Sequence, residues 1–210
     1  MYKRQGYTWL GDVAHTVSGW RTLGYADLGW EDFYGFYAAS SPYVLFVSGN
    51  SPYQTAQQLF DAMRGDPSMK WGNAGLGSIN QLTGSLMLEK LGLKGNSVPY
   101  DGGRSAAIKV VAGEVTWSWC GLSDILDLAQ SGDIRILGIC DSSPREIDCA
   151  KGNYTVPSLL DDYPELSDLQ GLLYWGFRVS RDTPADAVAK IRDAFQSTVC
   201  LLYTSPSPRD

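Results

Sequence analysis

The chain has 210 residues, a formal net charge of −6 and a hydrophobic fraction of 44%. This length and apolar content allow one or two compact domains with a proper core. An acidic protein lacks the basic face that nucleic-acid binding requires, so we expect no nucleic-acid partner. A single histidine and the absence of any CxxC pair argue against a zinc site, and we expect no metal.

Both ends of the chain are predicted to be scars that do not belong to the fold. If GTG is read as the start codon, the letters MYKRQ back-translate to GTG-TAT-AAG-AGA-CAG, and CLLYTS back-translates to TGT-CTC-TTA-TAC-ACA-TCT. These two strings are reverse complements over most of their length. Such an inverted terminal repeat is typical of a translated sequencing adapter. We therefore expect residues 1–5 and 200–210 to be adapter-derived, and residues 6–199 to be a metagenomic fragment without its original N-terminus or signal peptide.

Hydrophobic periodicity along the remaining chain predicts strands that alternate with helices. Strands are expected at residues 43–47, 70–74, 96–100, 115–119, 134–140 and 172–180. Helices are expected from Ser51 with Pro52 in first position, from residue 78, from residue 102, over 122–132, and after a cap at Thr183. A long loop is expected over residues 141–171. Alternation with short turns predicts an α/β fold whose largely parallel sheet is covered on both faces.

Each predicted helix is expected to bury one apolar stripe against the sheet, because residues three and four apart share a helix face. These stripes define which face of each helix should cover the strands. They are Leu59, Phe60 and Met63; Ile79, Leu82 and Leu86; Ile108 and Val111; and Val188, Ile191 and Phe195.

Glycine and serine gather where two predicted strands end, and ligands in such sheets bind beyond the carboxyl ends of the strands. In WGNAGLGSINQLTG, Gly75, Gly77 and Ser78 open a helix, where free N–H groups and the helix dipole attract an anion. A capped turn without a ligand is the favoured alternative for this loop taken alone. VPYDGGRSAA repeats the arrangement in a second loop, over residues 102–105.

Charged residues near these junctions suggest further contacts. Arg104 opposes the dipole in a first helical turn, so it should have a compensating anion, either Asp101 or a ligand carboxylate. Asp12 and His15 could form an acid–base pair, although a structural or solvent-facing histidine is the favoured alternative. No GxSxG surrounds a serine, so we expect no catalytic residue and no enzyme activity.

A nucleotide-binding enzyme remains the alternative function. GxGxxG would need glycine at position 80, where Asn80 stands, while Asp101 could be the acidic residue expected roughly 20 residues further on. The fingerprint thus half-matches for a dinucleotide or sugar nucleotide at the GLGS loop. An effector-sensing domain of a regulator is a third and weaker possibility.

Two cysteines leave a separate question open. Cys140 and Cys149 bound a short loop that could close as a disulfide in an oxidising compartment. Unrelated thiols are the alternative, and the spacing alone does not decide between them.

The order of segments resembles one family, the tripartite tricarboxylate transporter substrate-binding proteins (TctC/Bug). Its most specific parts are VPYxGG followed by a GxV strand, and SGxIRxL followed by VPSL. The resemblance implies a two-lobed periplasmic-binding-protein-like (type II) fold with an incomplete first lobe. Residues 6–48 would be part of lobe 1, residues 49–172 would form lobe 2, and residues 173–199 would be the crossover strand and helix that return to lobe 1.

The resemblance also implies a function. A monomeric periplasmic protein would capture a small di- or tricarboxylate, without a cofactor, and pass it to the membrane permease subunits of a tripartite tricarboxylate-type transporter. Gln81, Asp101 and Thr116 stand where the family commonly has His, Lys and Asp, which leaves the identity of the carboxylate open. The predicted ligand-binding residues are Gly75, Gly77, Ser78, Gly102, Gly103, Arg104, Ser105, Asp12 and His15.

Overall fold

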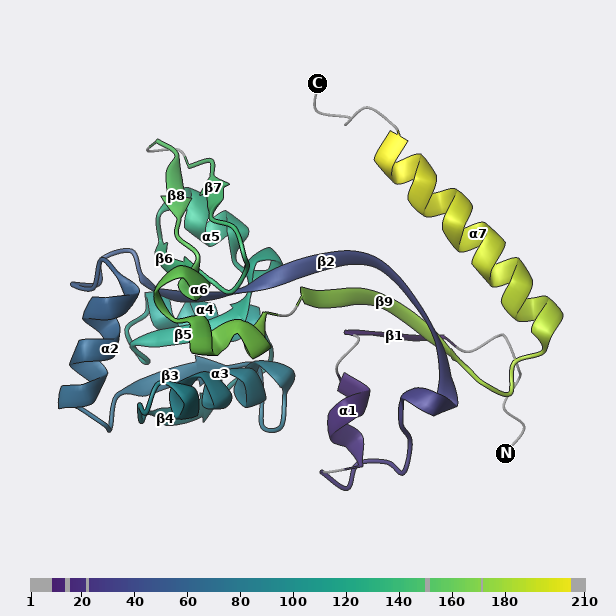
Figure 1. Cartoon of the computed structure of the whole chain (residues 1–210), viewed down its shortest axis with the longest axis horizontal. Coiled ribbons are helices and arrows are strands. Elements are labelled where there is room, and N and C mark those ends of the chain that lie inside the picture. The colour runs from purple at the N-terminus through teal and green to yellow at the C-terminus, as the bar shows by residue number, and fades with distance from the viewer. Residues whose placement is uncertain (1–8, 14–15, 22, 150–151, 171, 205–210) are drawn as a thin grey trace. The chain divides into compact units, whose positions relative to one another are not determined.

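The computed structural model describes residues 9–13, 16–21, 23–149, 152–170 and 172–204, which divide into two compact units. Unit 1 comprises Met1–Ser40 and Tyr174–Asp210, and unit 2 comprises Ser41–Leu173. The chain passes between the units within two long strands, β2 (Phe33–Ser48) and β9 (Leu172–Ser180) (Figure 1). None of the helices in the described residues combines the length and apolar character needed to cross a membrane.

The sheet of unit 2 is parallel except for one strand. β3 (Lys70–Asn73) pairs in parallel with β4 (Asn96–Pro99) and with β5 (Trp117–Gly121). β2 runs antiparallel to β5 on one side and to β6 (Ile134–Ile139) on the other. The expected largely parallel α/β sheet is therefore confirmed, with β2 as its single reversed strand.

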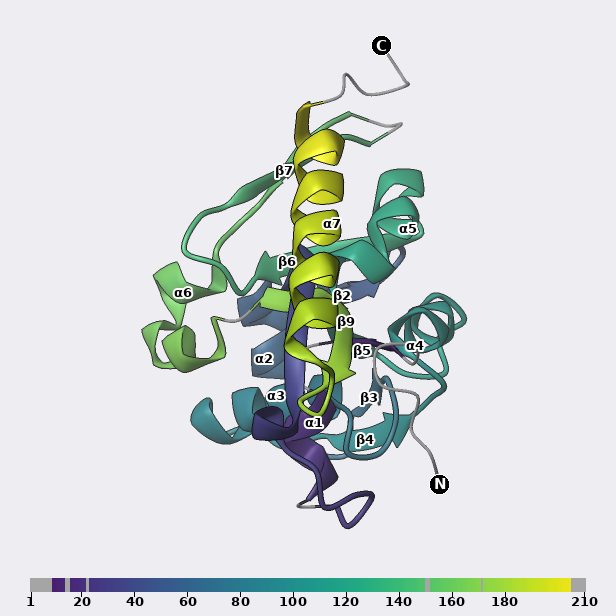
Figure 2. The ribbon, with the colours of Figure 1, turned by 90° about the vertical axis from the view of Figure 1, so that its right-hand side faces the viewer.

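Helices cover both faces of this sheet. α4 (Gly103–Val111) and α5 (Leu126–Ser131) lie on one side of the strands, and α2 (Ala56–Gly65) and α3 (Ile79–Lys90) on the other (Figure 2). Because successive strand residues point to opposite faces, each buried strand serves two cores.

The two core layers can be followed along β2 and β5. Val44 and Phe46 join a cluster with Ala107 of α4 and Ala129 of α5. On the other face Tyr43 stacks on Trp119 of β5, with ring centroids 5.6 Å apart. Burial on both faces explains why these strands are continuous apolar runs in the sequence.

The predicted face of α2 is correct, whereas those of α3 and α4 are wrong. Leu59, Phe60 and Met63 are buried as expected. On α3 the expected Leu82 is 49% exposed, and on α4 the expected Ile108 is 52% exposed. Each helix instead approaches the sheet through a small residue, since Gly84 of α3 lies against the Trp71 ring and Ala106 of α4 lies against Gly72 of β3. The other expected inward residues, Leu86 and Val111, are also exposed, and the residues that are buried are Gly84, Met87, Leu88, Ala106, Ala107 and Val110.

Helix α2 starts later than predicted. Its N-cap is Thr55, whose Oγ1 accepts a hydrogen bond from Gln58 N at 3.2 Å. Ser51 instead accepts from Tyr53 N at 3.3 Å, which closes a turn. Both residues suit a cap, and the structure places the cap at the one nearer the apolar stripe.

The long loop expected over residues 141–171 contains regular structure. It forms a two-stranded antiparallel sheet from β7 (Arg145–Ile147) and β8 (Tyr154–Val156), then α6 (Leu159–Asp162) and the 3-10 helix η3 (Pro164–Leu169). Cys140 and Cys149 are free thiols, and burial raises the pKa of the Cys140 thiol to about 12.

Unit 1 has its own small core. β1 (Leu10–Val13) pairs antiparallel with β9, and two short helices follow β1, α1 (Thr16–Trp20) and η1 (Trp30–Asp32). The predicted stripe of α7 (Ala185–Thr204) is correct: Val188 is buried with Phe36 and Val179, and Ile191 and Phe195 pack against them. α7 continues into residues 200–204, so the adapter origin of that end stays a prediction.

We predict that Gly84→Ala destabilises the protein by about 1–3 kcal/mol, because an added Cβ would lie 2.8 Å from the Trp71 ring in a packed core. Gly65→Ala is the matched control, since nothing lies within 4 Å of that Cβ in α2. Because Gly65 is the last residue of α2, where helix propensity counts less than in the interior, the control should change the free energy of unfolding by less than about 0.5 kcal/mol. Urea unfolding measures the free energy of unfolding of both variants, and equal changes would contradict the packing of Gly84 against Trp71.

Candidate functional site

The loop after β3 is held together by its own side chains. Asn73 is buried, its Oδ1 accepts from Gly75 N at 3.1 Å, and its Nδ2 donates to Ser97 Oγ of β4 at 2.8 Å. Gly77 N donates to Gln81 Oε1 at 2.6 Å, and Ser78 N donates to Gly75 O at 3.1 Å. The N–H groups of Gly75, Gly77 and Ser78 are therefore already used within the chain.

Ser78 is the N-cap of α3, as predicted. Its Oγ accepts from Gln81 N at 3.2 Å, and Gln81 Nε2 reaches Ser97 Oγ at 3.1 Å. Gly77 has φ +72°, a conformation that favours glycine. The favoured alternative for this loop, a capped turn, matches the hydrogen bonds that the structure shows. The same bonds occupy the amides that a dinucleotide phosphate would need.

The loop after β4 provides no capping side chain for the first turn of α4, which is called the bare start of α4 below. Gly102 has φ +94° and, having no side chain, cannot cap α4. Within the described part of the chain, the N–H groups of Gly103, Arg104 and Ser105 donate to no acceptor. Ser105 Oγ donates to Asp101 O at 2.7 Å, so the hydroxyl does not cap the helix either. Three unclaimed amides at the positive end of a helix form an anion-binding position.

Three further elements converge on the start of α4. A Cβ added at Gly103 would lie 2.6 Å from Asp124 Oδ2, 3.1 Å from Cys120 Cβ and 3.5 Å from Asn80 Nδ2. These side chains come from η2 (Leu122–Asp124), β5 and α3. Only glycine at 103 leaves room for them without a shift.

Asn80 and Asp124 are the two polar side chains that lie around Gly103. Neither is among the site residues predicted from the sequence. Asn80 is only 5% exposed, and its side chain forms no hydrogen bond to any described residue. Burial raises the pKa of the Asp124 carboxyl. In the sequence Asn80 counted only as a missing glycine, and Asp124 resembled an ordinary polar residue at a helix start.

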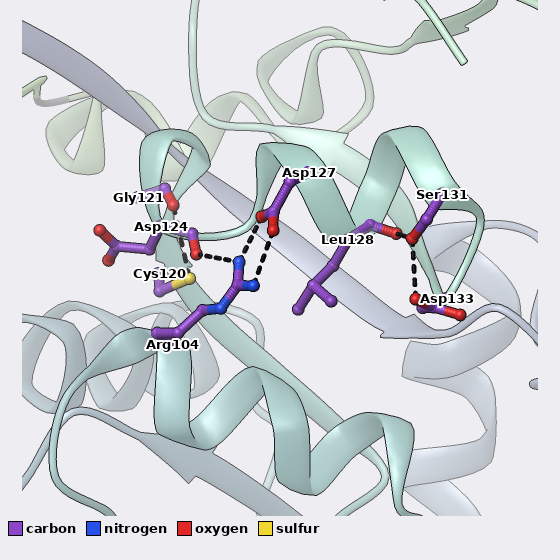
Figure 3. A network of polar contacts seen from close by, with 8 residues as sticks. All are labelled: Arg104, Cys120, Gly121, Asp124, Asp127, Leu128, Ser131 and Asp133. Atoms are coloured by element: carbon purple, nitrogen blue, oxygen red, sulfur yellow. Dashed lines mark hydrogen bonds and ion pairs between the residues drawn. The ribbon is translucent and has the colours of Figure 1, made fainter. Parts of the chain in front are cut away.

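Arg104 has a partner that the sequence did not indicate. Its guanidinium forms a two-pronged ion pair with Asp127 of α5, with Nη2 to Oδ2 at 2.7 Å (Figure 3). Nη1 also donates to the backbone oxygen of Asp124 at 3.3 Å. The expected pairing with Asp101 is wrong, and a ligand role for Arg104 stays a prediction. Periodicity could not reveal Asp127, because it comes from the next helix.

The two remaining predicted residues belong to the N-terminal segment. Asp12 is part of unit 1, where its backbone pairs with Gly176, and His15 lies outside the described residues. Their part in ligand binding remains a prediction.

A cavity of about 560 Å³ lies elsewhere in unit 2, between α2, α5, β6, β8 and α6. None of the predicted ligand residues lines it. Arg135, which does, donates to the carbonyl oxygens of Gly49, Ser51 and Tyr53, at 3.0 to 3.3 Å. Because backbone carbonyl oxygens accept these hydrogen bonds from Arg135, the cavity offers an anion fewer free donors than the bare start of α4 does.

A family model described as "Tripartite tricarboxylate transporter family receptor" (TctC) matches residues 4–201. The chain belongs to the TctC family. Among curated proteins no sequence matches. The fold is that of the periplasmic binding proteins, seen in solved structures that are 18–22% identical.

Three of these structures show how similar the folds are. A TctC solute-binding protein from Polaromonas without ligand has 20% identity and a TM-score of 0.68, covering 95% of this chain and 66% of its own. An R. palustris protein with adipate has 22% identity and a TM-score of 0.76, covering 97% and 66%. MatC from Rhodopseudomonas palustris with bound malate has 18% identity and a TM-score of 0.77, covering 92% and 65%. The chain thus spans just under two thirds of the length of these proteins.

We predict opposite pH dependences for two neighbouring aspartates. Burial raises the pKa of Asp124 above its ordinary 3.8, so its charge costs stability increasingly as pH rises from that value through the raised folded pKa. Asp124→Asn should therefore increase the free energy of unfolding at neutral pH and leave it unchanged well below pH 3.8. Urea unfolding across pH measures this.

Asp127→Asn is the matched control, because the hydrogen bond from Arg104 lowers the pKa of Asp127. The ion pair stabilises the fold above the ordinary value, and this contribution is lost as pH falls through the lowered folded pKa. The variant should therefore be less stable than the wild type at neutral pH, by a small amount since the pair is exposed. Effects of the same sign at both positions would contradict these environments.

Proposed function

We propose that the chain is a periplasmic solute-binding protein that captures a small carboxylate at the bare start of α4. The observation that carries this proposal is the set of three unclaimed N–H groups at Gly103, Arg104 and Ser105, beside the unpartnered amide of Asn80. Membership of the TctC family supports it, as do the adipate and malate named for two structures of the same fold.

The chemistry of the site fits a carboxylate. Its oxygens accept hydrogen bonds from backbone N–H groups without needing a cation, and the aligned peptide dipoles favour negative charge. Asn80 Nδ2 lies 3.5 Å from the Cβ position at Gly103, so this amide is a further donor beside the first residue of α4. Two or three charge-assisted hydrogen bonds at about 1.5–3 kcal/mol each contribute roughly 3–9 kcal/mol before the cost of ordering, so micromolar affinity, near −8 kcal/mol, requires the upper end of this range.

The remaining parts of the proposal follow from the family. The bound acid would be handed to the membrane permease subunits of a tripartite tricarboxylate-type transporter, with the protein acting as a monomer and without chemistry of its own. Gly75, Gly77 and Ser78 would shape the neighbouring wall of the site, since their amides donate to acceptors within the chain. No observation favours the nucleotide-binding enzyme over this function.

The proposal predicts that the chain binds one or more di- or tricarboxylates and that Asn80→Leu weakens this binding roughly 10- to 100-fold. The expected loss is that of one hydrogen bond to a charged group. Because the Asn80 side chain has no partner among the described residues, the substitution should leave the fold intact, which circular dichroism can check. Calorimetry and amide chemical shifts of residues 103–105 measure binding, with adipate, malate and citrate as probes.

Asn50→Leu is the matched control, because Asn50 is exposed and lines the cavity of about 560 Å³. It should bind the same acids as the wild type. If Asn50→Leu weakens binding and Asn80→Leu does not, the ligand occupies that cavity. If no carboxylate binds to the wild type, the proposed function is wrong.

A further inference from the structure

We propose that Asp124 is a resident anion at the start of α4, so that an anionic ligand binds there only together with a proton taken up by Asp124. This inference rests on the proposed function and concerns the same site. It names the residue that would set the pH dependence of binding and select against ligands that cannot share a proton.

The geometry places the Asp124 carboxylate beside the first residue of α4, next to the N–H groups that a ligand carboxylate would use. Its Oδ2 lies 2.6 Å from the Cβ position of Gly103, the first residue of α4. Asn80, which is buried and has no side-chain partner among the described residues, directs its Nδ2 toward the same point, at 3.5 Å. This amide is a donor that has no acceptor until a ligand or the neighbouring carboxylate provides one.

Arg104, the cation expected to neutralise a ligand, is instead paired with Asp127. Arg104 forms its two-pronged ion pair with Asp127 and gives a third hydrogen bond to the backbone oxygen of Asp124. Figure 3 shows the carboxylate of Asp124 directed away from this guanidinium. The positive charge is therefore already balanced by Asp127, on the side away from the Asp124 carboxylate.

The other groups around Asp124 are neutral at physiological pH. Cys120 of β5 is fully buried, and burial raises the pKa of its thiol well above the usual range, with the charge of Asp124 adding to the effect. Tyr43 of β2 also feels the charge of Asp124, and burial raises the pKa of its phenol. Asn80 of α3 and Gly103 of α4 carry no charge. Within the described chain, the residues packed against this carboxylate thus include no cation to balance it besides the helix start itself.

Two carboxylates that share one site cannot both stay ionised cheaply, and one of their pKa values rises strongly. Burial raises the pKa of Asp124 before any ligand arrives. A bound carboxylate would raise it further, so that Asp124 takes up a proton and donates it to the ligand in an O–H···O hydrogen bond. By linkage, affinity then increases as pH falls, by up to tenfold per pH unit.

The test compares the wild type with Asp124→Asn, using the intact chain and the acid found to bind best among adipate, malate and citrate. Titration calorimetry in buffers of different ionisation enthalpy counts the protons taken up, from pH 5 to pH 8, after correction for the acid's own titration. We expect uptake approaching one proton in the wild type and none in the variant. At pH 8 the variant should bind more tightly, by tenfold or more.

Asp127→Asn serves as the control for the loss of a nearby negative charge. It frees Arg104 but leaves Asp124 in place, so proton uptake should persist. Binding without proton uptake in the wild type, or weaker binding by Asp124→Asn, overturns the inference while leaving the proposed function standing. Absence of binding by the wild type and by both variants at every pH overturns both proposals.

Discussion

The stack of two indoles in the centre of unit 2 fixes the geometry of the candidate site. Trp71 of β3 and Trp117 of β5 are fully buried and parallel, with ring centroids 5.0 Å apart. α3 can cover Trp71 only because Gly84 presents no side chain to it. The same helix begins at Ser78 and carries Asn80 in its first turn. Packing in the middle of α3 therefore sets the position of a polar amide at its beginning.

This packing also shows which parts of the structure the sequence could predict. Strand positions followed from apolar runs, and the two glycine-containing junctions followed from turn chemistry, because both are local properties of the chain. The faces of α3 and α4 did not follow. A stripe of large apolar residues is a sound guide when the opposing surface is empty, but here the strands supply the bulk and the helices supply Gly84 and Ala106.

The site was predictable only to the level of its loops. Gly102 and Gly103 mark an anion-ready helix start, and the structure adds that this start is uncapped. What periodicity could not give is the partner of Arg104, because Asp127 reaches it from the following helix. Asp124 was missed for the same reason: nothing local in η2 shows that its carboxylate meets Gly103. Contacts between different helices and strands determine the surroundings of these charged side chains. Sequence spacing does not encode such contacts directly.

The first turns of α3 and α4 differ in whether their backbone N–H groups already have acceptors. At α3 the chain satisfies its own donors through Asn73, Ser78 and Gln81. At α4 the donors are open, and the carboxylate of Asp124 lies beside the first residue of the helix. A site built from peptide dipoles beside an acid attracts an anion only weakly over distance, so geometry and protonation must decide what stays bound. With Arg104 held by Asp127, the proposed function and the proposed role of Asp124 together imply that discrimination would rest on which acids can lie against the α4 amides and Asn80 while sharing a hydrogen bond with Asp124.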